Sequence, residues 1–254
     1  MPAPTTATKK ILVVGATGAT GKHVVQMLLD KGQTVVAVAR SEDKMKSLLK
    51  QQDYGDKLTV EEVSISELTP QDFQQLTKNC DAVVSCLGHN LTFKGLYKDG
   101  YFVSSTSKAL CEAMPSGCRF IMMGSDGVAN PDGSDPKRVF SERCILFLLR
   151  WLVPPHADNE KAALYLHQNR SKVDWSVVRP TDLIDADVSE YDIFDNNVTS
   201  LFGAGTATRA NVAHMMVRLV TEDDTWKQYK HVMPVLFDKK KPEEIATEGG
   251  KKSK

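Results

Sequence analysis

The sequence predicts an α/β fold in which helices cover both faces of a doubly wound parallel sheet. Short runs of apolar, β-branched residues alternate along the chain with segments of helical periodicity. The first part of the chain has no tight-turn hairpin pattern, and near-continuous apolar strands separated by helices are typical of a parallel sheet buried on both faces. In such a fold the ligand crevice lies at the carboxyl ends of the strands.

Six strands and the helices between them are expected in order over residues 11–178. A strand at residues 11–14 leads into a helix at 22–31 that has one apolar face. Thr69 and Pro70 predict the start of another helix, because threonine caps helices and proline suits their first position. The remaining expected elements are strands at 34–39, 58–65, 82–86, 120–123 and 175–178 and helices at 44–50, 70–78 and about 100–113.

The pattern becomes less regular toward the end of the chain. A long helical region ends near Arg170, and a polar stretch covers residues 182–197. A helix at about 210–220 and a strand at about 231–237 follow. We therefore expect a single folded domain at residues 10–238, with a flexible N-terminus at 1–9 and a disordered tail at 239–254.

The composition of the chain limits the kinds of partner that the protein is expected to bind. Lys and Arg total 32 and so do Asp and Glu, which gives no charge-based argument for binding nucleic acid or an acidic membrane. The first ten residues lack the apolar core of a signal peptide, and the apolar run at residues 144–153 is too short to span a bilayer. Five cysteines without CxxC spacing favour reduced thiols over a disulfide framework or a zinc site. These observations predict a cytoplasmic protein.

Glycines occur at every third position where the first strand meets the first helix. Glycine is costly inside ordered structure, so this spacing indicates a tight turn or a close approach to the backbone. Either the turn holds no ligand, or a pyrophosphate contacts its amides and the positive end of the helix. The strand–turn–helix context favours the second interpretation. The expected phosphate-binding residues are Gly15, Thr17, Gly18, Ala19, Thr20 and Gly21.

The end of the second strand indicates which dinucleotide binds. An acidic residue there favours NAD, whereas a cation accommodates the additional phosphate of NADP. Arg40 follows this strand and offers a planar, permanently charged fork, with Lys44 one helical turn further on. The alternative is that Arg40 is a solvated surface charge. We expect NADP as the cofactor.

Five segments of the chain resemble a known group of enzymes. The glycine pattern is GxxGxxG within VVGATGATG, and it is accompanied by VVAVARSEDK, DAVVSCLG, IMMGS and VDWSVVRPTDL. Together these segments resemble atypical and extended short-chain dehydrogenase/reductases, specifically the NAD(P)-binding, NmrA-like group that includes the biliverdin reductase B type of flavin reductase. The resemblance covers roughly residues 10–237. It implies one Rossmann domain with a small C-terminal substrate-binding region.

The resemblance also implies further cofactor contacts. Ser64 stands after the third strand, where relatives have a Gly-Asp pair that touches the adenine. The segment after the fourth strand corresponds to one that runs beside the cofactor, and the segment after the sixth strand lines the nicotinamide side. The residues implied by these two correspondences are Cys86, Leu87, Gly88, Pro180 and Thr181.

The catalytic pattern of typical short-chain dehydrogenases is missing. None of the six tyrosines has a lysine four residues later, so no Tyr-x-x-x-Lys pair supplies a phenol as proton donor. Ser125 corresponds to the serine that follows the fifth strand in relatives and is a candidate to bind substrate or nicotinamide. Lys161 lies near the family's lysine position and is a candidate for the nicotinamide ribose or for catalysis, with His156 as its rival at that place.

Two functions remain open at this point. One is an NADPH-dependent reductase of a flat or carbonyl-bearing small molecule such as a flavin or quinone, which needs little acid–base help. The other is a regulatory protein that binds NADP(H) without turnover, as NmrA-like members imply. The apolar run at residues 144–153 is either a buried helix or the wall of a substrate pocket. We expect a monomer or weak homodimer with no metal, nucleic acid or membrane partner.

Overall fold

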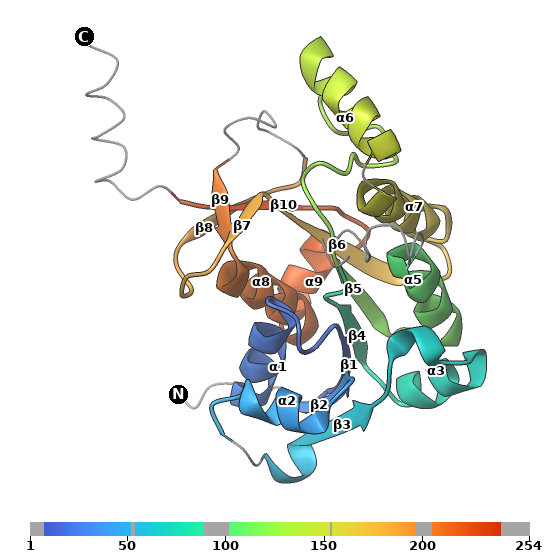
Figure 1. The fold of residues 1–254 in the computed structure, drawn as a ribbon, viewed down its shortest axis with the longest axis vertical. Helices are drawn as coiled ribbons and strands as arrows, with labels where there is room; N and C mark the ends of the chain where they lie inside the picture. The colour runs from blue at the N-terminus through green and yellow to red at the C-terminus, as the bar shows by residue number, and fades with distance from the viewer. Residues whose placement is uncertain (1–7, 52–53, 89–101, 153, 197–204, 240–254) are drawn as a thin grey trace.

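A computed structural model describes residues 8–51, 54–88, 102–152, 154–196 and 205–239. These residues form an eight-stranded sheet in the order β3-β2-β1-β4-β5-β6-β10-β8, with helices on both faces (Figure 1). All neighbouring strands from β3 to β10 run parallel, and only β8 is antiparallel to its neighbour. The predicted doubly wound α/β fold is confirmed.

The strands of the main sheet are bounded as follows: β1 Lys10–Val14, β2 Thr34–Ala39, β3 Leu58–Glu62, β4 Ala82–Ser85, β5 Arg119–Met123, β6 Asp174–Pro180, β8 Tyr191–Phe194 and β10 Val235–Asp238. The helices are α1 Gly21–Asp30, α2 Glu42–Ser47, α3 Pro70–Thr77, α5 Phe102–Ala113, α6 Phe140–Leu152, α7 Pro154–Gln168, α8 Arg209–Thr221 and α9 Asp223–Tyr229. Strands β7 (Asp182–Ile184) and β9 (Thr206–Thr208) form a second, two-stranded sheet.

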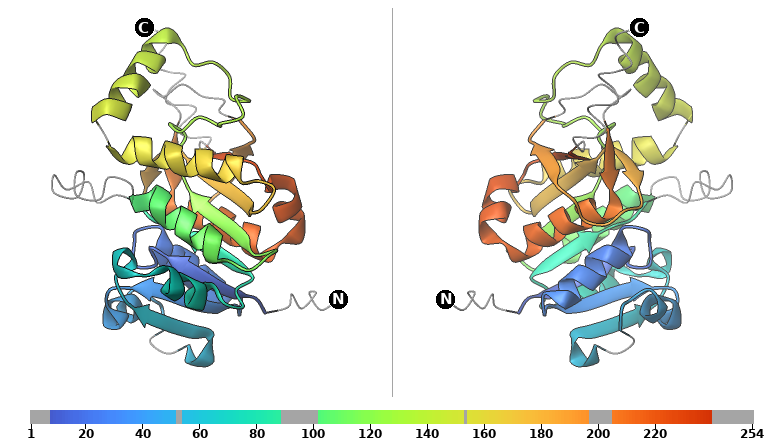
Figure 2. Two further views of the ribbon diagram at one scale, coloured as in Figure 1. Left: turned by 90° about the vertical axis from the view of Figure 1, so that its right-hand side faces the viewer. Right: turned by 90° about the vertical axis from the view of Figure 1, so that its left-hand side faces the viewer.

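Alternate residues of the central strands bury their side chains in two separate cores. In β1, Ile11 and Val13 pack with α1, α8 and α9 on one face, whereas Leu12 and Val14 pack with α3, α5 and α7 on the other. Figures 1 and 2 show these two helical layers on opposite sides of the sheet. Burial on both faces explains why the strand sequences are apolar throughout instead of alternating.

The first half of the sheet agrees with the sequence-based expectation, and the C-terminal part does not. Thr69 caps α3 in a capping box with Asp72, and Pro70 is the first residue of the helix, as predicted. The polar stretch at residues 182–197 was expected to be irregular, but it contains β7 and β8. The last strand begins at Val235, four residues later than expected. Alternating polarity at a sheet edge gives a weaker sequence pattern than a buried run does.

The expected chain ends are only partly covered by the structure. Residues 1–7 and 240–254 lie outside the described ranges. Lys9, which we expected in the flexible N-terminus, donates its backbone N–H to Gln33 Oε1 over 2.8 Å. Lys239, expected in the tail, donates its backbone N–H to the carbonyl of Glu190. In the described ranges, no helix combines the length and apolar character needed to cross a membrane.

Helix α6 projects beyond the two helical layers instead of packing into them (Figure 2). Phe140 is 78% exposed, and Phe147 and Leu148 are more than half exposed. None of the described side chains of the apolar run, residues 144–148, is buried, so this part of the run does not form the buried helix that was one of the two expected alternatives. The next helix along the chain, α7, packs against the sheet again.

A buried ion pair holds the loop between β5 and α6 against the sheet. Arg179 of β6 is 0% exposed, and its two Nη atoms lie 2.6 and 3.0 Å from the two carboxylate oxygens of Asp135. The same guanidinium donates to the backbone carbonyls of Val128 and Met233. Asp135 also accepts a hydrogen bond from the backbone N–H of Asn130. One cation thus fixes the path of the loop over residues 128–135.

Asp135→Ala is expected to lower the free energy of unfolding by roughly 3–5 kcal/mol, because it leaves a buried guanidinium without its counter-charge. Urea denaturation measures the loss. Asp132→Ala is the matched control in the same loop, where the exposed carboxylate accepts one backbone hydrogen bond from Ser134. The control should cost less than about 1 kcal/mol. Equal losses for the two variants would contradict the assigned role of the ion pair.

Candidate nucleotide-binding and substrate site

The three glycines of the first turn differ in what a side chain at each position would contact. Gly15 has φ +74°, and a Cβ atom there would lie 2.6 Å from the carbonyl oxygen of Cys86. A Cβ atom at Gly21, the first residue of α1, would collide with the Gly15 carbonyl. Gly18 is exposed, and a Cβ atom there would meet only the Gly15 carbonyl oxygen, at 3.0 Å. Packing therefore requires Gly15 and Gly21, whereas Gly18 keeps the outer surface of the turn open.

The start of α1 offers unpaired donors to an anion. Within the part of the chain that the structure describes, the backbone N–H groups of Ala19, Thr20 and Gly21 donate no hydrogen bond. The first turn of α1 contains no acidic residue. Thr17 is partly exposed beside these amides, whereas the Thr20 side chain is buried. Free amides at the positive end of a helix are suited to phosphate.

Two cations stand where the second strand ends. Arg40 and Lys44 are exposed, and neither side chain forms a hydrogen bond or ion pair with another described residue. Two neighbouring carboxylates, Glu42 and Glu62, are already engaged. Glu42 lies 2.7 Å from the Lys46 ammonium, and Glu62 accepts the backbone N–H of Glu42. Arg40 and Lys44 are therefore available to an external phosphate.

The segments after β3 and β4 reach the same edge of the sheet. Ser64 follows β3, and its hydroxyl lies 2.9 Å from that of Ser66. Cys86 and Leu87 are buried after β4, and Gly88 beside them is exposed. Burial raises the pKa of the Cys86 thiol to about 12, so the thiol remains protonated. Separately, the backbone carbonyl of Cys86 is the group that packs against Gly15.

Ser125 lies just beyond β5, at the carboxyl edge of the sheet. Its Oγ accepts the backbone N–H of Gly127 over 3.3 Å. Burial raises the pKa of the neighbouring Asp126 carboxyl, an effect opposed by the positive charge of Arg138. Arg138 also donates to the Asp126 backbone carbonyl over 2.7 Å. The segment that carries Ser125 is therefore fixed by the hydrogen bond within its own turn and by the hydrogen bond from Arg138.

The end of β6 contributes a buried hydroxyl to this edge. Pro180 is the last residue of β6, and Thr181 follows it with its backbone N–H bonded to the Leu236 carbonyl. Thr181 is 5% exposed, and its Oγ1 has no hydrogen-bond partner among the described residues. A buried polar atom without a partner costs free energy, so this hydroxyl is suited to a ligand.

The structure separates the two rivals for the family's lysine position. The His156 ring lies beside Gly127, and its Nε2 is buried 3.4 Å from Glu160 Oε1. Lys161 is exposed on α7, one residue beyond Glu160. The side chain that reaches the loop carrying Ser125 is therefore His156. Sequence reasoning named His156 as the rival but missed Glu160, for which the only available indication was the i,i+4 spacing.

No tyrosine of the described region replaces the missing phenol at this place. Tyr165 is on the same helix, but burial raises its pKa to about 12. A catalytic phenol needs a lowered pKa, so this shift has the opposite direction. The described residues also contain no group of three or more His, Cys, Asp or Glu side chains that could hold a metal ion.

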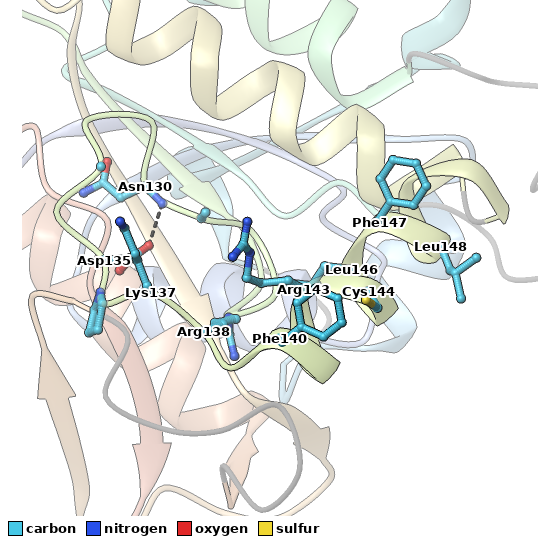
Figure 3. Close-up of a pocket in the computed structure, with 13 residues that line it drawn as sticks. Asn130, Asp135, Lys137, Arg138, Phe140, Arg143, Cys144, Leu146, Phe147 and Leu148 are labelled. Atoms are coloured by element: carbon cyan, nitrogen blue, oxygen red, sulfur yellow. Dashed lines mark hydrogen bonds between the residues drawn. The ribbon is translucent and has the colours of Figure 1, made fainter.

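A pocket of about 780 Å³ lies between α6 and the loop at residues 129–138 (Figure 3). Phe140, Leu146 and Phe147 of α6 supply part of its apolar wall. Its cations include Lys137 and Arg143. The apolar run at residues 144–153 was expected to form either a buried helix or a pocket wall, and its described side chains form a wall.

The pocket is connected to the segment that carries Ser125. Arg138 lines the pocket and donates to the carbonyl of Asp126, which directly follows Ser125. Asp135 also lines the pocket while forming the buried pair with Arg179. The same loop therefore shapes the pocket and positions Ser125.

The fold and this edge of the sheet define a doubly wound α/β protein with an open glycine turn at the start of α1. A family model described as NAD(P)H-binding matches residues 15–223, and the chain belongs to this family. The matched range begins at the first glycine of the turn and includes Arg40, Ser125 and Thr181. A nicotinamide cofactor is therefore the ligand class of this fold.

Solved structures of similar proteins share the fold. The oxidoreductase ylbE from Lactococcus lactis is 20% identical with a TM-score of 0.66, covering 94% of this chain and 95% of its own. A putative NADH-flavin reductase from Streptococcus pneumoniae is 20% identical with a TM-score of 0.62, covering 91% and 100%. The anaerobillin reductase ChuY from Escherichia coli O157:H7 is 17% identical with a TM-score of 0.64, covering 92% and 99%.

One curated relative matches only a part of this chain. A hybrid PKS-NRPS synthetase from Talaromyces variabilis is 32% identical over 85 residues, which are 31% of this chain. The chain spans about 2% of the length of that protein.

Gly18→Val is expected to weaken binding of both NADPH and NADH by at least about tenfold while the fold is retained, because its side chain would occupy the open surface of the turn. Gly21→Ala should instead destabilise the protein by about 1–3 kcal/mol, because its methyl group collides with the Gly15 carbonyl. Titration calorimetry and thermal unfolding separate the two effects. Unfolding of Gly18→Val would show that packing, and not a ligand, requires this glycine.

Proposed function

We propose that this protein is an NADPH-dependent oxidoreductase that transfers a hydride to a flat or carbonyl-bearing acceptor such as a flavin or quinone. The observation that carries the proposal is the loop over residues 125–138, which begins at Ser125 on the nucleotide-binding edge and continues into the wall of the apolar pocket. Two proteins of similar fold are named as a putative NADH-flavin reductase and an anaerobillin reductase, and these names support this class of acceptor.

The residues present suit such a cofactor and divide the work of binding it. The free amides at Ala19, Thr20 and Gly21 would hold the pyrophosphate, and Ser64, Cys86, Leu87 and Gly88 would flank the adenosine half. Pro180 and the unpaired Thr181 hydroxyl would lie on the nicotinamide side. When bound, NADPH supplies the hydride, and the chain's task is to orient the reactants and exclude water. Lys161 remains a proposed contact to the nicotinamide ribose.

NADP is proposed over NAD because two unpaired cations follow β2. The Arg40 fork can bind a phosphate in a bidentate manner, and Lys44 adds a second charge. A 2′-phosphate would therefore gain two charge-assisted contacts that a ribose hydroxyl would not make to the same extent.

A second function is favoured by the missing proton donor. No Tyr-x-x-x-Lys pair occurs in the chain, and the pKa of Tyr165 is raised instead of lowered. A regulatory protein that senses NADP(H) without turnover would need the nucleotide site alone. The apolar pocket beside Ser125 favours the reductase, since a sensor of the nucleotide has no need of a second ligand cavity.

We propose a small-molecule substrate and no nucleic-acid or membrane partner, on the balanced charge of the chain. A monomer or weak homodimer located in the cytoplasm is proposed with them. The five cysteines all carry free thiols, which is compatible with a reducing compartment.

The deciding experiment follows NADPH oxidation spectroscopically with riboflavin, menadione and an aliphatic aldehyde as acceptors. The reductase proposal expects oxidation that depends on protein concentration and saturates with riboflavin or menadione. Tight NADPH binding by calorimetry together with no turnover of any acceptor would instead establish the sensing function. Failure to bind either nucleotide would contradict both functions.

Arg40→Ala is expected to weaken NADPH binding about tenfold to hundredfold, because a charge-assisted hydrogen bond contributes about 1.5–3 kcal/mol. Binding of NADH, which lacks the phosphate, should change by less than about twofold. Arg170→Ala removes an exposed arginine after α7 and serves as the matched control. Calorimetric titrations of both nucleotides test the difference, and equal losses for NADPH and NADH would contradict the NADP assignment.

A further inference from the structure

The pocket beside α6 lies next to the carboxyl edge of the sheet and not on it. Among the described residues, its lining comes from the loop after β5 and from α6, and neither Ser125 nor Thr181 is part of it. Arg138 joins the two places, because it lines the pocket and donates to the carbonyl of Asp126. An acceptor that reacts at the edge of the sheet would therefore place a different part of itself in the pocket.

One face of α6 is apolar and borders the pocket. Its apolar residues follow the i, i+4, i+7, i+8 spacing that brings side chains to one side of a helix. They are Phe140, Cys144, Phe147 and Leu148, and all four line the pocket (Figure 3). None of the four belongs to either hydrophobic core. Helix α6 therefore presents its apolar face to the pocket and not to the core.

Cations occupy the polar part of the lining. Asp135 is the acidic residue among the described lining residues, and its carboxylate is already paired with Arg179. Lys137 and Arg143 are exposed, and neither forms an ion pair with another described residue. Long cationic side chains keep their charge in water while their stems lie along apolar surface. Lys137 and Arg143 therefore form a hydrated rim beside the apolar wall of α6.

The apolar wall is long enough for a chain of several carbons. From Phe140 to Leu148 it extends ~12 Å, at about 1.5 Å of helix rise per residue. The pocket volume of about 780 Å³ is that of a complete small-molecule site. An alkyl or isoprenoid chain can lie along this wall. The ribityl chain of a flavin would instead lose water from its hydroxyl groups without gaining hydrogen bonds from apolar side chains.

We propose that the apolar wall of α6 binds a side chain of the acceptor, so that the acceptor is a quinone with a long alkyl or isoprenoid substituent. The quinone ring lies at the edge of the sheet that carries Ser125, and the chain lies along Phe140, Phe147 and Leu148. This inference rests on the proposed reductase function and specifies its substrate class. Burial of the chain supplies binding free energy away from the reacting ring and so holds the ring in place.

The test uses three 2,3-dimethoxy-5-methyl-1,4-benzoquinones that carry a methyl, butyl or hexyl group at ring position 6. Because their rings are fully substituted, thiols have no free ring carbon to add to. Calorimetry measures binding of each quinone without NADPH, and NADPH oxidation measures kcat/KM. Each methylene that leaves water should tighten binding about twofold to fourfold, so the hexyl compound should bind at least about tenfold more tightly than the methyl compound.

Two variants remove parts of the wall. Phe147→Ala and Leu148→Ala should each lower the ratio of hexyl to methyl affinity about threefold or more. Both side chains are more than half exposed, so the fold is retained. Leu164→Ala is the matched control, because Leu164 is an exposed leucine of α7 outside the described lining, and it should keep the full ratio. High salt should also keep the ratio, because burial of an apolar chain is not screened as an interaction between charges is.

Alkylation of Cys144 gives a measurement that needs neither a variant nor turnover. Cys144 lines the pocket and is exposed, whereas Cys80, Cys86, Cys111 and Cys118 are buried. N-ethylmaleimide should therefore label Cys144 first, and mass spectrometry follows the rate of labelling. The hexyl compound should slow this labelling at concentrations at which the methyl compound does not.

Equal binding of the methyl and hexyl compounds would overturn the proposal. A hexyl preference that persists unchanged in both wall variants, or that high salt abolishes, would overturn it as well. Oxidation of NADPH by the methyl compound with no gain from the chain refutes the chain site and leaves the reductase function in place. A hexyl preference in binding without NADPH oxidation refutes the reductase function and leaves the chain site. The two failures are therefore distinguishable.

Discussion

The ion pair between Arg179 and Asp135 is the constraint on which the acceptor side of the molecule depends. A guanidinium with 0% exposure is tolerated only when it is paired and its remaining N–H groups are bonded, and here a carboxylate and two backbone carbonyls meet that requirement. Because Asp135 belongs to the loop after β5, the pair fixes that loop to β6. The path of the pocket-lining loop follows from this attachment, whereas the backbone on both sides of Ser125 is bonded directly to β6, from Gly124 N–H to the Val178 carbonyl and from Asp126 N–H to the Pro180 carbonyl.

The nucleotide side depends on backbone geometry instead. Gly15 and Gly21 allow the first turn to pack against Cys86 and against itself, and among the described residues the amides of Ala19, Thr20 and Gly21 donate no hydrogen bond. No side chain has to be placed for those donors to be available. The two sides therefore differ physically: one is formed by the path of the main chain and the other by side chains held in place by a buried charge.

This difference explains which features could be predicted from the sequence. The glycine turn, the succession of strands along the chain through β6 and the cation at Arg40 follow from local patterns of neighbouring residues. The pairing of Arg179 with a carboxylate 44 positions away has no local pattern in the sequence. His156 and the exposure of Phe140 also depend on how α6 and α7 meet the loop, which a pattern of hydrophobicity does not specify.

The nucleotide side and the acceptor side are formed by different groups, so the acceptor side can change by itself. Ser125 and His156 come from the end of β5 and from α7, whereas the glycine turn and the cations after β2 come from other elements. The exposed apolar residues of α6 form a wall that the core does not need, since both helical layers are complete without it. Under the proposed function, such a fold can change the wall of its acceptor pocket while it keeps the glycine turn and the cations after β2, because α6 and those groups belong to different elements.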